Sequence, residues 1–257
     1  MTEQRANGPI GMFDSGVGGI SVLREAVRQL PHEHFIFYGD TLHAPYGTKD
    51  RQTVLALTRR ATERLLDMGV KALVIACNTA TSAAAAALRE EYPDLPIIGL
   101  EPALKPAAAL HRDGVILSLA TPGTLAGEKY RRLLSQYGAG VVSLPCPGLM
   151  ELVEKMELDS PALHAYLDAL FAPYQGQKVE AVVLGCTHYS FLKRAIARHF
   201  PQTPLLDGNA GTARQLRRRL AEKGLLSERS ERGKIHLFSS GGEAAARQMR
   251  MLLEEPD

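Results

Sequence analysis

LVIACNTA at residues 73–80 and VVLGCTHY at residues 182–189 are two versions of one sequence pattern. Each version has an apolar run, a small residue, a cysteine and one or two polar residues, and a segment of helical periodicity follows. A continuous apolar run of this length is typical of a strand that is buried on both faces of a parallel sheet. Each pattern therefore predicts a strand that delivers a cysteine, Cys77 or Cys186, to its carboxyl end.

The residues that follow each cysteine suit the amino-terminal end of a helix. They are Asn78, Thr79 and Thr81 after the first cysteine, and Thr187 and Ser190 after the second. A thiol in this position faces backbone N–H groups and the positive end of the helix dipole, which favour the thiolate. Each cysteine is therefore a candidate nucleophile or base, and their matching contexts indicate a pair.

Strand and helix patterns alternate along the rest of the chain, which predicts an α/β fold with mainly parallel sheets. Cys186 follows Cys77 by 109 residues, and Thr121 follows Asp14 by 107 residues at the ends of two other expected strands. Because the two pairs of residues have nearly the same separation in the sequence, we predict two pseudo-symmetric, three-layer α/β domains. Because ligands of such domains bind beyond the carboxyl ends of the strands, we expect an active site in the interdomain cleft, with one thiol on each side of a small ligand.

The glycine-rich turn Asp14–Gly19 (DSGVGG) follows another expected strand, Pro9–Phe13. It does not fit a dinucleotide-binding fingerprint, because Ser21 stands where the third glycine should be, and no lysine completes a P-loop. We expect instead a tight turn that exposes Asp14 and Ser15 to a small anionic or zwitterionic ligand. The alternative is a close strand–helix turn in which Asp14 is only a helix cap.

The composition is that of an ordinary globular protein, with 257 residues, 45% hydrophobic residues and a net charge of +2. This charge is too slight to indicate a nucleic-acid partner. Met1–Pro9 is polar and no apolar run approaches the roughly 18 residues of a membrane span, so we expect neither a secretory signal nor a membrane association. Three cysteines without C-x-x-C spacing, and histidines without metal-ligand spacing, predict reduced thiols, no metal and a cytoplasmic protein.

Two opposed thiols suit the inversion of a stereocentre. One thiolate removes a proton from carbon, and a thiol on the other face returns a proton. No lysine lies in a recognisable cofactor motif, so pyridoxal phosphate is not indicated and no cofactor is expected. The protein itself must then supply hydrogen-bond donors to the carboxylate over which the carbanion charge spreads.

The two cysteine motifs resemble the paired signatures of the cofactor-independent aspartate/glutamate racemases. FDSGVGG at residues 13–19 and APYG at residues 44–47 resemble the glutamate-specific members of that family in particular. The resemblance extends from about Ile10 to Leu253, with four motifs in the right order. It implies the interconversion of L-glutamate and D-glutamate, with D-glutamate supplied to peptidoglycan synthesis.

The resemblance also implies roles for individual residues. Cys77 would deprotonate D-glutamate and Cys186 would deprotonate L-glutamate, while Asp14 and His188 would assist the thiols and Glu154 would lie near His188. The substrate carboxylates and ammonium would meet Asp14, Ser15, Tyr46, Gly47, Asn78, Thr79, Thr121, Thr124 and Thr187. Ser190 stands where the family often has proline, a departure that bears on the start of the helix after Cys186.

The family further implies how the chain divides and assembles. The expected domains are residues 1–100 plus 208–257, carrying Cys77, and residues 101–207, carrying Cys186. The return of the last segment to the first domain is taken from the family alone. A homodimer and a small-molecule substrate are likewise expected from the family.

Alternatives remain at this point. Aspartate racemase performs the same chemistry on a side chain one methylene shorter, and a non-catalytic amino-acid-binding protein of this fold would not need two thiols. The basic segment Arg214–Lys223 is interpreted as a solvated helix face, and its functional alternative is an anionic partner, such as the DNA gyrase that some racemases of this type bind. Cys146 lies between two prolines without a matching motif, so we interpret it as a core residue.

Overall fold

The computed structural model describes residues 6–255 of the chain. These residues form two compact units, 6–100 together with 209–255, and 101–208. The expected first domain also includes residues 1–5 and 256–257, which lie outside the described residues, as does part of the Met1–Pro9 segment that was expected not to be a secretory signal.

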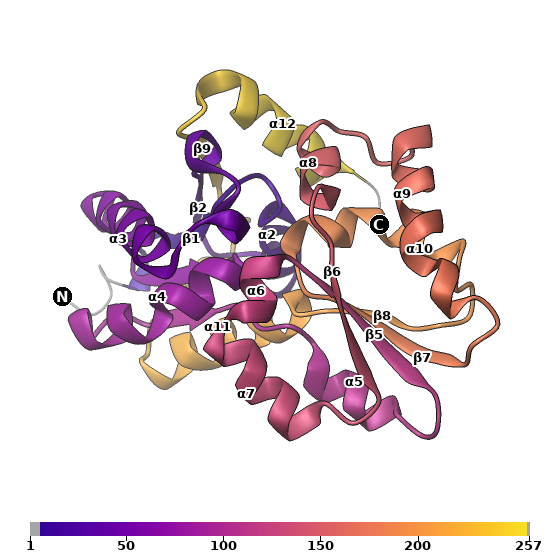
Figure 1. Ribbon diagram of the computed structural model, residues 1–257. Helices are drawn as coiled ribbons and strands as arrows, with labels where there is room; N and C mark the ends of the chain where they lie inside the picture. The colour runs from indigo at the N-terminus through magenta and orange to yellow at the C-terminus, as the bar shows by residue number, and fades with distance from the viewer. Residues whose placement is uncertain (1–5, 256–257) are drawn as a thin grey trace. The chain divides into compact units, whose positions relative to one another are not determined.

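The first unit contains a five-stranded sheet in the order β4-β3-β1-β2-β9, and all its strand pairs are parallel (Figure 1). The strands are Ile10–Asp14 (β1), Phe35–Gly39 (β2), Ala72–Ile75 (β3), Ile97–Gly99 (β4) and Ile235–Ser239 (β9). Every residue of β1, β2 and β3 is buried, because helices cover both faces of a parallel sheet.

Helices α3 and α4 pack on each other and against the strands of this sheet, and α2 packs with α11 and α12. The helices are Ile20–Gln29 (α2), Arg51–Asp67 (α3), Asn78–Glu91 (α4), Asn209–Glu222 (α11) and Gly242–Glu254 (α12). Two short 3₁₀ helices, Thr41–His43 (η1) and Tyr46–Thr48 (η2), follow β2.

The second unit contains a four-stranded parallel sheet in the order β6-β5-β7-β8 (Figure 1). The strands are Val115–Ala120 (β5), Val141–Pro145 (β6), Val179–Leu184 (β7) and Leu205–Asp207 (β8). The helices are Leu104–Leu110 (α5), Pro122–Ala126 (α6), Glu128–Tyr137 (α7), Leu149–Glu154 (α8), Pro161–Phe171 (α9) and Lys193–Ala197 (α10), with 3₁₀ helices Ala172–Tyr174 (η3) and Thr187–Leu192 (η4).

The two sheets have one topology. The order β4-β3-β1-β2 in the first becomes β8-β7-β5-β6 in the second, so β3 corresponds to β7 and β1 to β5. Cys77 follows β3 and Cys186 follows β7, and Asp14 and Thr121 stand at the ends of β1 and β5. The two sequence offsets thus reflect a repeated strand order, and the predicted α/β class with parallel sheets is confirmed.

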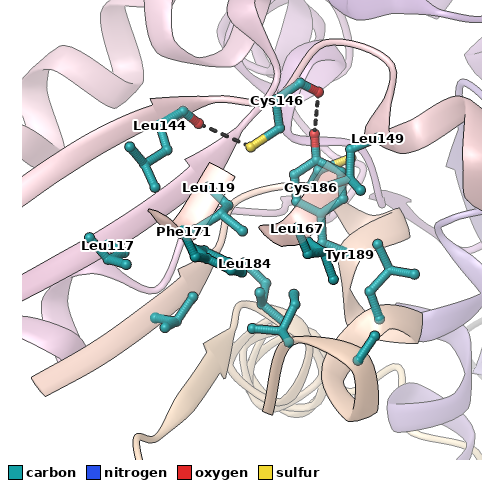
Figure 2. Packing of buried hydrophobic residues seen from close by; sticks show 14 of the residues in the cluster. Leu117, Leu119, Leu144, Cys146, Leu149, Leu167, Phe171, Leu184, Cys186 and Tyr189 are labelled. Carbon is teal, nitrogen blue, oxygen red and sulfur yellow. Dashed lines mark hydrogen bonds between the residues drawn. The ribbon is translucent and has the colours of Figure 1, made fainter. Parts of the chain in front are cut away.

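The second unit contains a large core cluster, part of which is drawn in Figure 2. It joins Leu119 of β5 and Leu184 of β7 to Leu149 of α8, Leu167 of α9 and Tyr189 of η4, all nearly or completely inaccessible to solvent. Cys146 and Cys186 lie in the same cluster. The Cys186 side chain is therefore surrounded by tightly packed residues.

Two predicted helices differ from the observed ones. The sequence predicts one helix that follows residues 121–124 and runs through Tyr137. The structure instead has two helices, α6 and α7, because Gly127 between them has an extended backbone (φ −70°, ψ 141°). The helix expected after Cys186 begins as the 3₁₀ helix η4 and becomes α-helical only at Lys193. The prediction of an α-helix directly after the second cysteine is therefore wrong.

Candidate functional site

Cys77 lies at the amino-terminal end of α4, as its sequence context predicts. It is the cap residue of that helix, with an extended backbone, and its Sγ accepts a hydrogen bond from Ala80 N at 3.4 Å. The side chain is almost completely buried, at 6% exposure. The positive end of a 14-residue helix and a backbone N–H thus act on this sulfur, and both favour the thiolate.

Ser15 connects Cys77 to Asp14. The Ser15 hydroxyl is 3.5 Å from Cys77 Sγ and donates a hydrogen bond to Asp14 Oδ1 at 3.2 Å. Gly16 N donates to the same carboxylate oxygen at 2.7 Å. The first thiol therefore has a hydroxyl and a carboxylate beside it.

The expectation that the turn exposes Asp14 and Ser15 is wrong, since they are 0% and 4% exposed. Asp14 is buried because the end of the turn, at Gly19, packs closely against its side chain. A Cβ atom on Gly19 would lie only 2.7 Å from Asp14 Cβ, so the glycine permits this packing.

Cys186 has a different partner. Its Sγ is 3.6 Å from Nδ1 of His188, and Nε2 of His188 is 2.7 Å from Oε1 of Glu154. Thr187 Oγ1 also lies 3.4 Å from the same ring nitrogen. Cys186 precedes a 3₁₀ helix and not an α-helix, and its neighbours are an imidazole and, through the imidazole, a carboxylate.

The surroundings of His188 favour its charged form. Burial alone would lower the pKa of this histidine, but its hydrogen bonds to Cys186 and Glu154 outweigh burial and raise the pKa well above the ordinary value of 6.5. The ring is only 1% exposed. A buried imidazolium between a thiol and a carboxylate stabilises a thiolate at Cys186 by charge as well as by hydrogen bonding.

Tyr46 and Gly47 lie on η2, after β2. The Tyr46 hydroxyl donates to Asp40 Oδ2 at 2.7 Å, and its ring centroid is 6.0 Å from that of Phe13. Tyr46 is 1% exposed and belongs to the same core cluster as Cys77. Asp40 was not predicted as a site residue, although its position between a strand end and the APYG loop was a signal that could have found it.

Asn78 and Thr79 begin α4 and are both buried. Oδ1 of Asn78 accepts no hydrogen bond from any described residue, although it is buried. A buried acceptor without a donor is rare in native proteins, and this one is suited to an N–H of a ligand.

Thr121 caps α6 in the second unit. Its Oγ1 accepts a hydrogen bond from Thr124 N at 3.2 Å and donates to Thr124 Oγ1 at 3.0 Å. Both threonines are buried at the carboxyl end of β5, the neighbour of β7. They thus occupy the place in this sheet that Asp14 and Ser15 occupy in the other.

The structure thus gathers the predicted residues into one group in each unit. The first group is Asp14, Ser15, Tyr46, Gly47, Cys77, Asn78 and Thr79, and the second is Thr121, Thr124, Glu154, Cys186, Thr187 and His188. In each group, several residues lie at the carboxyl ends of two neighbouring parallel strands: β1 and β3 in the first unit, and β5 and β7 in the second. Ligands of α/β proteins bind at these strand ends.

Cys146 differs chemically from the other two cysteines. Burial, with a smaller effect of nearby Cys186, raises the pKa of its thiol to about 12. Its Sγ donates to Leu144 O at 3.3 Å, and its own carbonyl accepts from the Tyr189 hydroxyl at 3.2 Å (Figure 2). The interpretation of Cys146 as a core residue is confirmed.

We expect Cys146→Ala to retain turnover within about threefold and to lower the free energy of unfolding by about 1–2 kcal/mol, because it removes only a buried sulfur. Steady-state assays and urea unfolding measure the two effects. A tenfold or larger loss of turnover in a stably folded variant would assign Cys146 a chemical role.

The basic residues of α11 are solvent-exposed. Arg218 and Arg219 lie 3.5 Å and 2.9 Å from carboxylate oxygens of Glu222, and Lys223 donates to Asp94 O at 3.2 Å. Such local pairs are typical of a solvated helix face.

None of the helices within residues 6–255 combines the length and the apolar composition that a membrane span requires. Within the same range, no group of three or more His, Cys, Asp or Glu side chains is arranged to hold a metal ion.

Comparisons with known proteins agree with this geometry. Residues 13–216 match the family model described as Asp/Glu/Hydantoin racemase. A glutamate racemase from Clostridium acetobutylicum is 50% identical over 236 residues, which are 91% of this chain and 92% of the relative.

Two solved structures are also similar. A glutamate racemase from Francisella tularensis in complex with D-glutamate has a TM-score of 0.83 at 27% identity, covering 97% of this chain and 95% of that one. The Escherichia coli glutamate racemase, in complex with L-glutamate and the activator UDP-MurNAc-ala, has a TM-score of 0.82 at 29% identity, covering 96% and 94%.

Proposed function

This chain belongs to the Asp/Glu/hydantoin racemase family, and from that premise we propose that it is a glutamate racemase, which interconverts L-glutamate and D-glutamate. One observation carries the proposal. Each unit has a cysteine directly beyond the carboxyl end of an inner strand, β3 or β7. Ser15, which is hydrogen-bonded to Asp14, lies beside Cys77, and His188, which is hydrogen-bonded to Glu154, lies beside Cys186. A binding protein would need neither the two thiols nor their partners.

The reaction needs one thiolate and one thiol. With D-glutamate, the Cys77 thiolate takes the proton from the α-carbon, and the electron pair of the C–H bond spreads into the carboxylate. The Cys186 thiol then donates its proton to the opposite face of the carbon and becomes a thiolate. L-glutamate reacts by the reverse sequence, so each turnover exchanges the protonation states of the two cysteines. This mechanism requires the two thiols to face opposite sides of the substrate.

The partners of the thiols differ between the two half-reactions. Beside Cys77, the helix terminus and the Ala80 N–H stabilise a thiolate. The Ser15 hydroxyl, which donates to Asp14, lies next to the same sulfur. Beside Cys186, the imidazolium of His188 stabilises the thiolate and Glu154 holds the ring. Asp14, His188 and Glu154 therefore assist the thiols in this mechanism.

The remaining residues bind the substrate. The buried Oδ1 of Asn78 would accept a hydrogen bond from the substrate ammonium. Hydroxyl and backbone N–H donors at the strand ends would stabilise the negative charge on the carboxylates. The residues proposed to bind the substrate, besides Asn78, are Asp14, Ser15, Tyr46, Gly47, Thr79, Thr121, Thr124 and Thr187.

We also propose the domain bounds, the cellular compartment and the oligomeric state of the protein. We assign the two domains to residues 1–100 plus 208–257 and residues 101–207. The reaction uses no cofactor, takes place in the cytoplasm of a cell that keeps thiols reduced, and supplies D-glutamate for peptidoglycan. The protein acts as a homodimer. The three described cysteines form no disulfide, which supports a compartment that keeps thiols reduced, and the names of the relatives support D-glutamate as a product.

Circular dichroism tests the substrate and the reaction together. Purified protein is incubated with L-glutamate, and separately with L-aspartate, without added cofactor. We expect the L-glutamate signal to decay to zero and the L-aspartate signal to persist. Decay with aspartate alone would make the protein an aspartate racemase. If neither signal changed, while calorimetry detected glutamate binding, the protein would be an amino-acid-binding module.

A further inference from the structure

Asp40 stands between the end of β2 and the loop that carries Tyr46. Its carboxylate is buried, with 5% side-chain exposure. Its backbone N–H donates to Asp14 O at 2.9 Å, which connects the start of the loop to the end of β1. A buried carboxylate needs several donors to remain ionised, so its partners show what it organises.

The Asp40 carboxylate gathers donors from the strand and the loop. Oδ2 accepts from the Tyr46 hydroxyl at 2.7 Å, and Oδ1 accepts from the His43 ring at 2.8 Å and from the Tyr38 hydroxyl at 3.4 Å. Burial opposes ionisation, but the bonds from His43 and Tyr46 outweigh it and hold the pKa of Asp40 below its ordinary value. The carboxylate is thus a charged acceptor at neutral pH.

The turn between β9 and α12 secures the same loop from a distant part of the sequence. The hydroxyls of Thr41 and Ser239 are 2.7 Å apart, and Leu42 N donates to Ser240 Oγ at 3.0 Å. Gly241 N donates to Thr41 Oγ1 at 3.1 Å. The Ser240 side chain also helps to lower the pKa of Asp40. Residues about 200 positions apart therefore hold η1 next to Asp40.

Tyr46 connects Asp40 to the hydrophobic cluster that contains Cys77. Its ring packs on Phe13 within the cluster that contains Cys77 and Ile75. Burial and the Asp40 carboxylate both raise the pKa of Tyr46, so its hydroxyl keeps its proton and remains a donor to Asp40. The hydrogen bond to the carboxylate therefore helps to fix the orientation of the Tyr46 ring.

We infer that Asp40 is a positioning residue, which fixes Tyr46 and Gly47 next to Cys77 and thereby sets the affinity for the substrate. The inference rests on the proposed function, because that proposal makes the loop part of the substrate site. Asp40 acts through the Tyr46 hydroxyl and does not touch the reacting atoms.

The test compares Asp40→Ala, Asp40→Asn, Tyr46→Phe and the double variant Asp40→Ala/Tyr46→Phe. We expect Asp40→Ala to raise KM about tenfold for both enantiomers, with kcat changed about threefold or less, because a loose loop weakens binding more than chemistry. Asp40→Asn keeps an oxygen acceptor for Tyr46 and should restore much of the affinity. The double variant should have the KM of Asp40→Ala, because the two residues act as one unit.

His43→Ala is the matched control, since it removes another donor from the same carboxylate and leaves the Tyr46 bond. Its KM should stay within about twofold of the wild type. A KM for Asp40→Ala equal to that of the wild type, or multiplicative effects in the double variant, would overturn the inference.

Hydrogen exchange supplies a measurement that does not depend on catalysis. The amides of residues 41–48 should exchange about tenfold faster in Asp40→Ala, with those of β1 and β3 unchanged. If the wild type fails to racemise glutamate, the proposed function fails, and the exchange result still decides whether Asp40 holds the loop. Unchanged exchange in this segment would refute the positioning role.

Discussion

Cys77→Ser and Cys186→Ser should each lose racemisation in both directions by about a thousandfold or more. Every turnover uses both groups, one as base and the other as acid. A serine hydroxyl has nearly the shape of the thiol, but it is far less acidic and cannot supply the basic form at neutral pH. The measurement is the rate of signal loss in circular dichroism with each enantiomer.

The two variants should also differ from each other in heavy water. Cys186→Ser retains the base that acts on D-glutamate, so it should slowly exchange the α-proton of D-glutamate without inverting it. Cys77→Ser should do the same with L-glutamate alone. Proton NMR of the α-hydrogen measures both, and Cys146→Ala is the control for removal of a buried thiol. Substantial racemisation by either serine variant would eliminate the two-thiol mechanism.

His188→Asn should lower kcat by roughly a hundredfold to a thousandfold, while Glu154→Gln should have a smaller effect. Asparagine can still form a hydrogen bond, but it carries no charge to stabilise the Cys186 thiolate. Glutamine leaves the histidine in place and removes only the charge that helps to keep its ring protonated. If His188→Asn kept wild-type turnover, Cys186 would not depend on this imidazole.

The same histidine gives a stability prediction with a definite sign. The pKa of His188 is higher in the folded protein than the ordinary 6.5 of an unfolded chain, so the folded state binds its proton more tightly. The stabilisation is fully present below pH 6.5 and is lost as the pH rises through the raised value. Urea unfolding of the wild type and His188→Asn across this range should therefore show a difference that decreases with pH. A constant difference would contradict a charged His188.

Local sequence patterns predicted most of the secondary structure. The apolar runs before Cys77 and Cys186 became β3 and β7, because a buried parallel strand needs only a short continuous apolar segment. Gly69 ends α3 with a φ of +75°, a conformation that glycine adopts without strain. The division at Gly127 and the 3₁₀ helix after Cys186 escaped prediction, because packing against the rest of the unit decides between short helical forms.

The sequence by itself determined the α/β class, the repeat of the cysteine-bearing pattern and the position of each cysteine at a strand end, because these depend on periodicity and on residues adjacent in the chain. Only the tertiary structure decided the partners of those thiols. Glu154 reaches His188 across 34 residues, Ser15 reaches Cys77 across 62, and Ser239 reaches Thr41 across 198. These contacts form near the edge of each sheet at which the parallel strands end. A local sequence pattern cannot predict which side chains meet there, because the residues are far apart in the chain.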